Sequence, residues 1–137
     1  MAIELANGKI ITGKTQDFMS APAGAILNAI KHLCRVDDDI KLIPTQILET
    51  IISLKRDVIA SKKTHITLKD TLIALAIASN SSDLAKKCLE KIRLLKGCEM
   101  HSTCILSHSD ENNLKSLGLN VTVEPEFIDN SLYENNK

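Results

Sequence analysis

Along this chain, some segments space their apolar residues with the period of a β-strand and others with the period of an α-helix. Two short β-prone runs flank Asn7-Gly8, a pair typical of the type I′ turn of β-hairpins. Between residues 20 and 33, Ile26 and Ile30 belong to a set of apolar residues at helical spacing, with a proline tolerated near the start. The pattern therefore predicts a hairpin followed by an amphipathic helix that packs on the sheet.

The middle of the chain predicts one strand and three helices. Residues 39–44 alternate and stop at a proline, which indicates a strand, and Thr45 is the expected N-cap of a long helix after it. Thr67-Leu-Lys-Asp70 imitates a capping box before a helix that is apolar nearly all round and so should be deeply buried. The run 80–83 can cap a fourth helix, which ends at Gly97.

The last third predicts a strand within 99–107, a short helix over 109–117 closed by Gly118, and a strand over 119–124. The element order is then β-β-α-β-α-α-α-β-α-β, which favours the α/β class with a single mixed sheet and helices packed against it. We expect one domain over 1–127 and a polar, frayed tail over 128–137.

The amino-acid composition limits the classes of partner that the chain is expected to bind. The chain has 137 residues, 44% of them hydrophobic, and 17 basic side chains balance 17 acidic ones, so no global field attracts nucleic acid or an anionic membrane. The three aromatic residues, Phe18, Phe127 and Tyr133, offer almost no stacking platform for single-stranded nucleic acid. The longest apolar run, 72–78, is far too short to span a bilayer.

The location predicted for the chain is the cytoplasm. The amino terminus lacks the basic segment and apolar stretch of an export signal. A domain with this apolar content needs no disulfides, so free thiols are expected at the four cysteines, Cys34, Cys88, Cys98 and Cys104.

One segment satisfies a nucleotide-binding motif. Gly8-Lys-Ile-Ile-Thr-Gly13-Lys14-Thr15 fits the P-loop pattern, in which backbone N–H groups cradle phosphates and the lysine contacts them. A P-loop follows a strand and is itself a flexible wrap, whereas here the interior of the motif is strand-forming and Gly8 belongs to the hairpin turn. The context therefore disfavours an ATPase.

Metal and hydrolase sites are also disfavoured. Cys98, His101, Cys104 and His108 lie within eleven residues, but in an extended strand the outer pair would be roughly 30 Å apart, so one zinc ion could not bind all four. Serines near these histidines lack a nucleophile elbow and an orienting acid, and the acidic run 37–39 is typical of a solvated turn. We predict no metal and no cofactor, and we find no catalytic constellation.

Several segments together resemble a known family. They are Ile10-Ile-Thr-Gly-Lys-Thr15, Leu27-Asn-Ala-Ile-Lys-His-Leu33, Lys96-Gly-Cys-Glu-Met-His-Ser-Thr-Cys-Ile-Leu-Ser107, Leu117-Gly118 and Glu124-Pro125. Through them nearly the whole chain is similar to the carboxy-terminal domain of a bacterial family catalogued as domain of unknown function 1846. Members of that family are much longer, so the chain resembles either an isolated domain or a naturally short relative.

The resemblance implies a cytidine-deaminase-like topology with a helical insert between residues 67 and 96. Zinc deaminases need His-x-Glu at one junction and Pro-Cys-x-x-Cys at the next. Those places read Thr15-Gln-Asp-Phe-Met-Ser20 and Pro44-Thr-Gln-Ile47, so no deaminase activity follows. Some relatives have been labelled ATP-dependent peptidases, but neither a nucleotide site nor a protease constellation supports that label here.

Two functional hypotheses remain open. In the first, the hairpin exit and the strand ends converge near helix N-termini to hold a small anionic metabolite or nucleotide, with Lys14 and backbone amides as the main donors. The residues of that predicted site are Thr12, Lys14, Thr15, Thr45, His101, Ser107 and His108. In the second, the helices of 67–96 pack against the amino-terminal part of longer relatives or build a homo-oligomer.

Overall fold

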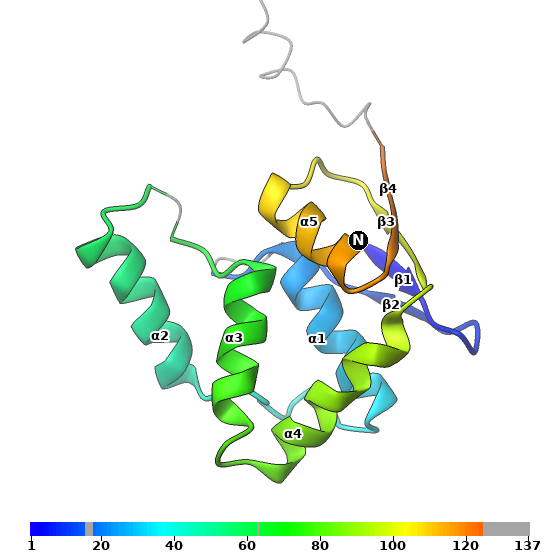
Figure 1. Cartoon of the computed structure of the whole chain (residues 1–137), viewed down its shortest axis with the longest axis horizontal. Helices are drawn as coiled ribbons and strands as arrows, with labels where there is room; N and C mark the ends of the chain where they lie inside the picture. Colours follow the sequence, from blue (N-terminus) through cyan, green and yellow to red (C-terminus); the bar gives the residue numbers. More distant parts are fainter. Residues whose placement is uncertain (16–17, 63, 125–137) are drawn as a thin grey trace, which may run out of the picture.

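Four strands form one mixed sheet in the computed structural model, which describes residues 1–15, 18–62 and 64–124 (Figure 1). They are β1 (Ala2–Glu4), β2 (Ile10–Thr12), β3 (Glu99–Ser102) and β4 (Asn120–Val123), in the spatial order β2-β1-β3-β4. Strand β1 pairs antiparallel with β2 and β3, whereas β3 and β4 are parallel. The predicted α/β class with a single mixed sheet is confirmed.

Five α-helices and two short helical turns complete the described part of the chain. The helices are α1 (Ala21–Leu33), α2 (Thr45–Ser53), α3 (Leu68–Ala78), α4 (Asp83–Glu90) and α5 (His108–Ser116). A π-helical turn, η1 (Leu54–Val58), continues α2, and a 3₁₀ turn, η2 (Lys91–Leu95), continues α4. None of the helices within the described ranges has the length and apolar character needed to cross a bilayer.

The hairpin forms where the pattern predicted it, but with a different turn. Gly8 N–H donates to the carbonyl of Leu5 at 2.8 Å, so Ala6 and Asn7 are the central turn residues. Gly8 has a φ of +86°, whereas Asn7 is not among the residues with positive φ. A type I′ turn needs positive φ at both central residues, so the connection is instead a type I turn followed by a glycine in the left-handed region.

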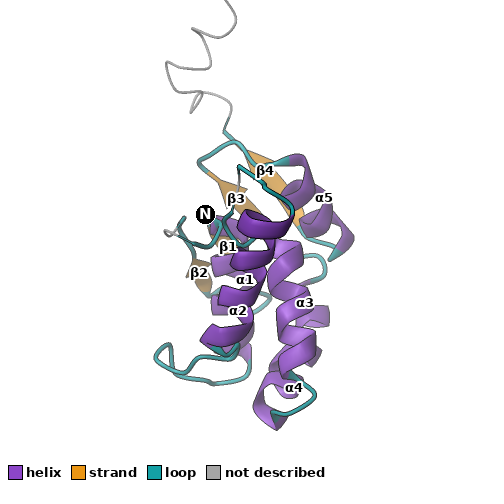
Figure 2. Cartoon of the chain, turned by 90° about the vertical axis from the view of Figure 1, so that its left-hand side faces the viewer, coloured by secondary structure: helices purple, strands orange, loops and turns teal. Residues whose placement is uncertain are grey.

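Helix α1 lies between the sheet and the other helices. It contacts β1 and β2 on one side and α3 and α4 on the other. Its buried face is built from small and branched apolar residues, among them Ala25, Ile26 and Ile30, which are fully buried. Figure 2 shows the sheet toward the top of the molecule and α4 at the bottom, and Figure 1 shows α2 at the left-hand edge. The sheet therefore packs on helices through one face only, where Ile3 and Met100 point into the core.

The strand predicted over residues 39–44 is absent. That segment is a turn followed by irregular chain, and Pro44, not Thr45, is the residue before the first turn of α2. Leu42 and Ile43 are buried in the core, so the apolar pattern was real. The apolar pattern comes from side chains that anchor a loop in the core. Two adjacent residues that both point inward do not follow the alternation of a paired strand.

The third and fourth helices follow their predicted caps. Thr67 Oγ1 accepts a hydrogen bond from Asp70 N, and the Asp70 carboxylate accepts one from Thr67 N, which completes the capping box of α3. Ser82 caps α4. The prediction that α3 is deeply buried is wrong on one side, since Ile73 and Ile77 are each about half exposed.

The strand expected within 99–107 is also shorter than the pattern suggested. Strand β3 ends at Ser102, whose hydroxyl bonds to Cys104 within a bend, and residues 103–107 leave the sheet before α5. Cys104 is consequently exposed, whereas Cys98 is buried. With the 39–44 strand missing, the deaminase-like topology is not confirmed. Residues 125–137, including the predicted tail, lie outside the described part of the chain.

Candidate functional site

The register of the sheet places Ala2 between Thr12 and His101. Ala2 is the partner of Thr12 across β1–β2 and of His101 across β1–β3. Neighbouring strands lie about 4.8 Å apart, so these two side chains stand roughly 10 Å from each other with only a methyl group between them. A pocket of about 530 Å³ opens there, lined by Met1, Ala2, Thr12, Gly13, Lys14, Asn28, His101 and Thr103. We call it the Lys14 pocket.

Gly13 sets the course of the chain into this pocket. A Cβ atom at Gly13 would lie 2.4 Å from the backbone nitrogen of Ala25, so only glycine lets the hairpin exit approach α1 this closely. The segment between the two glycines of the P-loop pattern is strand β2, and Gly8 lies in the hairpin turn. The glycines therefore serve a turn and a close packing contact rather than a phosphate-binding loop.

Lys14 follows directly and carries the positive charge of the pocket. Its side chain is exposed, and it makes no hydrogen bond or ion pair with any other described residue. Asn28 of α1 donates its side-chain amide to the carbonyl of Thr12 at 2.9 Å and so ties the helix to the edge strand β2. An unpaired ammonium beside hydroxyl and amide groups is suited to binding an anion.

His101 lies on β3 with both ring nitrogens engaged. Nδ1 lies 2.8 Å from Thr122 Oγ1, and Nε2 lies 3.0 Å from Glu124 Oε1. Both partners come from β4 or the residue after it, so the ring leans along the sheet surface. His101 therefore walls the Lys14 pocket, and it could offer a nitrogen to a ligand only by releasing one of these contacts.

The other predicted site residues lie elsewhere. Thr15 and Ser107 line a second pocket, of about 320 Å³, between the beginnings of α1 and α5. Thr45 lines a third, of about 400 Å³, and accepts a hydrogen bond from Lys41 Nζ at 3.4 Å. His108 is the exposed first residue of α5 and lines none of these three pockets. The structure thus brings Thr12, Lys14 and His101 together and places the other four predicted residues outside that pocket.

Two residues with polar side chains in the Lys14 pocket, Asn28 and Thr103, were not predicted from the sequence. Asn28 had a usable signal, because it is a polar residue within a helix of mostly small apolar side chains. Thr103 had none, because it reaches the pocket only through the early end of β3. Both add polar groups beside Lys14.

The four cysteines and histidines of 98–108 do not converge. The Cys98 thiol is buried and bonds to the carbonyl of Leu94 at 3.7 Å, while the His101 ring faces β4. Cys104 and His108 are exposed on the loop and the helix that follow. Within residues 1–15, 18–62 and 64–124, no three His, Cys, Asp or Glu side chains are grouped so as to hold a metal ion.

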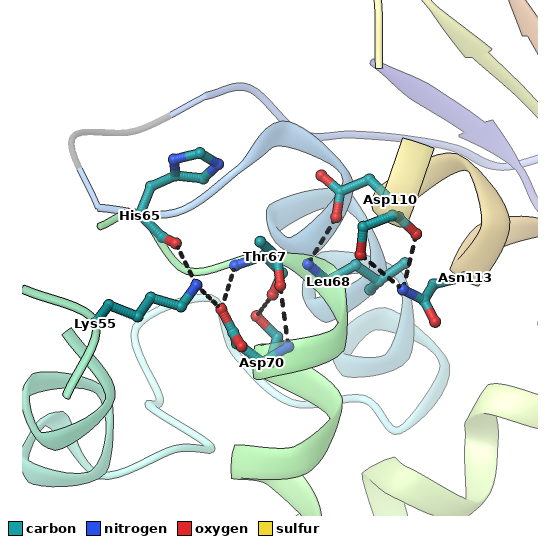
Figure 3. Close-up of polar contacts among 9 residues, drawn as sticks. Lys55, His65, Thr67, Leu68, Asp70, Asp110 and Asn113 are labelled. Atoms are coloured by element: carbon teal, nitrogen blue, oxygen red, sulfur yellow. Dashed lines mark hydrogen bonds and ion pairs between the residues drawn. The ribbon is translucent and has the colours of Figure 1, made fainter. Parts of the chain in front are cut away.

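A polar cluster at the start of α3 ties three helices together (Figure 3). Lys55 of η1 forms an ion pair with Asp70 and donates to the carbonyl of His65 at 3.0 Å. The pKa of Asp70 is lowered: burial raises it, but the hydrogen bonds from Lys55 and from Thr67 N outweigh that effect. Asp110 of α5, which is buried, accepts a hydrogen bond from Leu68 N at 3.0 Å. This cluster fixes helix positions, since its charged groups are partnered.

The comparisons with known proteins define the family. Residues 1–133 match the model described as "Domain of unknown function DUF1846, C-terminal". A UPF0371 protein of Clostridium tetani (strain Massachusetts / E88) is 43% identical over 136 residues, which are 99% of this chain and 27% of that relative. A UPF0371 protein of Clostridioides difficile (strain 630) is 44% identical over 133 residues, 97% of this chain and 26% of that relative.

The structure defines the class of this protein. It is an α/β domain with one mixed sheet, packed on helices through one face, and with a pocket that contains a lysine. The chain belongs to the DUF1846 family, as the resemblance in its sequence indicated. It spans about a quarter of the length of the curated relatives it matches, whose names state no activity, ligand or substrate.

Proposed function

We propose that this domain binds a small anionic metabolite or nucleotide in the Lys14 pocket. The observation that carries the proposal is the convergence of Thr12, Lys14 and His101, from two segments far apart in sequence, on one pocket of about 530 Å³. That volume is within the range of small-molecule sites, which bring a few polar groups together in a concave surface. Binding, rather than a reaction, is proposed for these residues.

The charge of the pocket favours an anion. Lys14 is unpaired among the described residues, and no carboxylate belongs to the described lining of the pocket. Glu124 contacts the opposite side of the His101 ring and is itself partnered there. The hydroxyl groups of Thr12 and Thr103 can donate to the oxygens of a phosphate or carboxylate.

A thermal-shift screen tests this proposal. The protein is heated with a panel of nucleotides, phosphorylated metabolites and dicarboxylates, because a ligand that binds only the folded state raises the midpoint of unfolding. At least one anion should raise it in a concentration-dependent way. The Lys14→Ala variant should lose most of that shift, and Lys86→Ala, which removes another exposed lysine, on α4, should keep it.

Two results would remove the proposal. One is a panel in which no anion shifts the midpoint at concentrations far above the expected dissociation constant. The other is a shift that Lys14→Ala and Lys86→Ala reduce equally, since that would report a general charge effect. Salt matched across the panel separates specific binding from ionic strength.

A second candidate function is packing against the amino-terminal region of the longer relatives. The end of α2 and η1 leaves Leu54, Val58 and Ile59 exposed, at 47%, 74% and 62%. Monomeric proteins rarely leave neighbouring large apolar side chains open to water without a partner. The matched region is described as C-terminal and fills only 27% of the relatives, which leaves a long segment to cover this edge.

Binding to that segment can be measured directly. The remainder of the Clostridium tetani relative, expressed separately, should bind this domain, and Val58→Asp with Ile59→Asp should weaken binding at least tenfold. Lys62→Asp, an exposed neighbour, is the charge-matched control. A domain that forms its own dimer through Val58 and Ile59, and does not bind the added segment, would contradict the assignment and make a second copy the occupant.

A cytoplasmic location is part of the proposal and is supported by the four free thiols.

A further inference from the structure

A pocket of about 400 Å³ lies between α1, the start of α2 and the loop that joins them, and neither candidate function uses it. It contains Thr45 of the predicted site, but Lys14 does not line it, and Asn28 is the one described residue that it shares with the Lys14 pocket. We call it the Leu48 pocket. Its volume is within the range of about 300–1,000 Å³ that small-molecule sites occupy.

The wall of the Leu48 pocket is largely apolar. Leu27 of α1 and Leu48 of α2 line it, and both are only partly buried. Leu42 and Ile43, which anchor the joining loop in the core, belong to the same lining. Phe18, the one aromatic residue within the described ranges, also lines the pocket and is 44% exposed. A phenyl ring open to water beside two leucines favours a ligand with an apolar body.

Two lysines add positive charge to the same pocket. Lys31 Nζ donates to the backbone carbonyl of Asp38 at 3.3 Å, and Lys41 Nζ donates to Thr45 Oγ1 at 3.4 Å. Both acceptors are neutral, both distances are at the long end for a hydrogen bond, and neither ammonium forms an ion pair with a described residue. A carboxylate offers these ammonium groups shorter, charge-assisted bonds.

Asp38 is the one acid in the described lining, and it does not cancel this charge. Lys31 is bonded to its carbonyl, and Lys41 lies three residues further along the same loop. Two ammonium groups against one carboxylate leave the lining with a net charge of +1. The Asp38 carboxylate can also accept a hydrogen bond from an ammonium group of a ligand, so the pocket suits an amino acid as well as a simple acid.

We infer that the Leu48 pocket is a second ligand site, for a small carboxylate whose apolar body has the size of a leucine or phenylalanine side chain. The carboxylate binds to the two lysines, and the apolar body lies against the two leucines and Phe18. The ligand is either an apolar amino acid, whose ammonium group then faces Asp38, or the corresponding acid without an amino group. The inference goes beyond the Lys14 pocket and does not depend on it.

A methyl NMR titration of the chain, labelled with ¹³C at its leucine methyl groups, tests the site. The probes are L-leucine, 4-methylpentanoate, 4-methylpentanamide and acetate, at matched ionic strength. The methyl signals of Leu27 and Leu48 should shift along a saturable curve with L-leucine, with 4-methylpentanoate or with both. The amide lacks the charge and acetate lacks the apolar body, so each should bind at least tenfold more weakly. Tighter binding of L-leucine identifies an amino acid as the ligand class, and tighter binding of 4-methylpentanoate identifies the simple acid.

Matched variants test the two halves of the site separately. Lys41→Met keeps the carbon chain but removes the charge, and it should weaken binding at least fivefold, whereas Lys87→Met, on α4, should not change it. Phe18→Ala should weaken binding by a similar factor, whereas Ile77→Ala, which shortens a comparably exposed apolar side chain of α3, should not. Lys14→Ala should also leave the curve unchanged, because Lys14 does not line the Leu48 pocket.

Three results would overturn the inference. They are shifts that rise linearly with every probe, an amide that binds as tightly as the carboxylates, and Lys41→Met and Phe18→Ala proteins that both bind as the wild type does. Each of them would leave the Leu48 pocket as a surface hollow between α1 and α2. None of them concerns the Lys14 pocket, whose ligand is tested separately with Lys14→Ala.

Discussion

His101 and Glu124 form a contact of 3.0 Å between Nε2 and Oε1, at the rim of the Lys14 pocket. The carboxylate can only accept, so the proton of this hydrogen bond belongs to Nε2. Thr122 holds the other nitrogen at 2.8 Å. The ring is thereby oriented along β4, and the pocket gains a fixed wall on the side opposite Thr12.

This contact should position His101 without stabilising the fold much. The two side chains are 43% and 37% exposed, and exposed ion pairs contribute about 0–1 kcal/mol. A double-mutant cycle with His101→Ala and Glu124→Ala, measured by urea unfolding, should give a coupling energy below about 1 kcal/mol. A coupling several times larger would show that the pair is a structural anchor.

Asp70 should contribute more to the free energy of unfolding than the contact between His101 and Glu124 does, and its contribution should depend on pH. Asp70→Asn removes the ion pair with Lys55 and weakens the bond to Thr67 N, so we expect a loss of about 2 kcal/mol at pH 7. The native pKa of Asp70 is lowered from 3.8, so its stabilisation is present above that value and disappears as pH falls through the lowered pKa. Urea unfolding at several pH values measures this.

The control for Asp70 is Asp39→Asn, which changes an exposed acid in the turn before α2. Its stability should follow that of the wild type at every pH. A difference between wild type and Asp70→Asn that stays constant from pH 7 to pH 2 would contradict the proposed linkage, because an unshifted carboxylate would then account for the loss.

Gly13 and Gly8 should be needed for different reasons. Gly13→Ala places a Cβ 2.4 Å from Ala25 N and should cost about 1–3 kcal/mol through overpacking. Gly8→Ala meets no atom within 4 Å but forces alanine to a φ of +86°, which should cost about 1–2 kcal/mol. Asparagine tolerates that φ better, so Gly8→Asn should recover part of the loss and Gly13→Asn none. Equal behaviour of the two asparagine variants in thermal unfolding would refute the distinction.

The cysteines should differ sharply in reactivity. Burial, and then the neighbouring Cys34 thiol, raises the pKa of Cys88 to about 12, whereas Cys104 is exposed. At pH 8 a thiol reagent should modify Cys104 first and Cys88 only after unfolding, as mass spectrometry of timed samples can show. The raised pKa also means that the contribution of Cys88 to stability is lost between pH 9.0 and about 12. Labelling of native Cys88 as fast as Cys104 would contradict this environment.

Much of the fold could be predicted because local signals carried it. The hairpin, the helix caps at Thr67 and Ser82 and the glycines that follow α4 and α5 are short-range features, readable residue by residue. The failures needed tertiary information. Leu42 and Ile43 look like part of a strand but anchor a loop, because no neighbouring strand is available to pair with them.

The candidate site was predictable only in part, for a related reason. Thr12 and Lys14 follow from the end of the hairpin, but their closeness to His101 depends on the register of β1 against β3, which joins residues 99 positions apart. Thr45 was placed in the site because a strand was expected before it, and the loss of that strand moves it to another pocket.

The most direct measurement is an NMR titration of the labelled protein with the anion that gives the largest thermal shift. The central claim is that the Lys14 pocket binds it, so the amides of Thr12, Gly13, Lys14 and Thr103 should shift together along one saturable curve, and Lys14→Ala should abolish the curve. Saturable shifts confined to other residues, with Lys14→Ala binding as the wild type does, would contradict the claim.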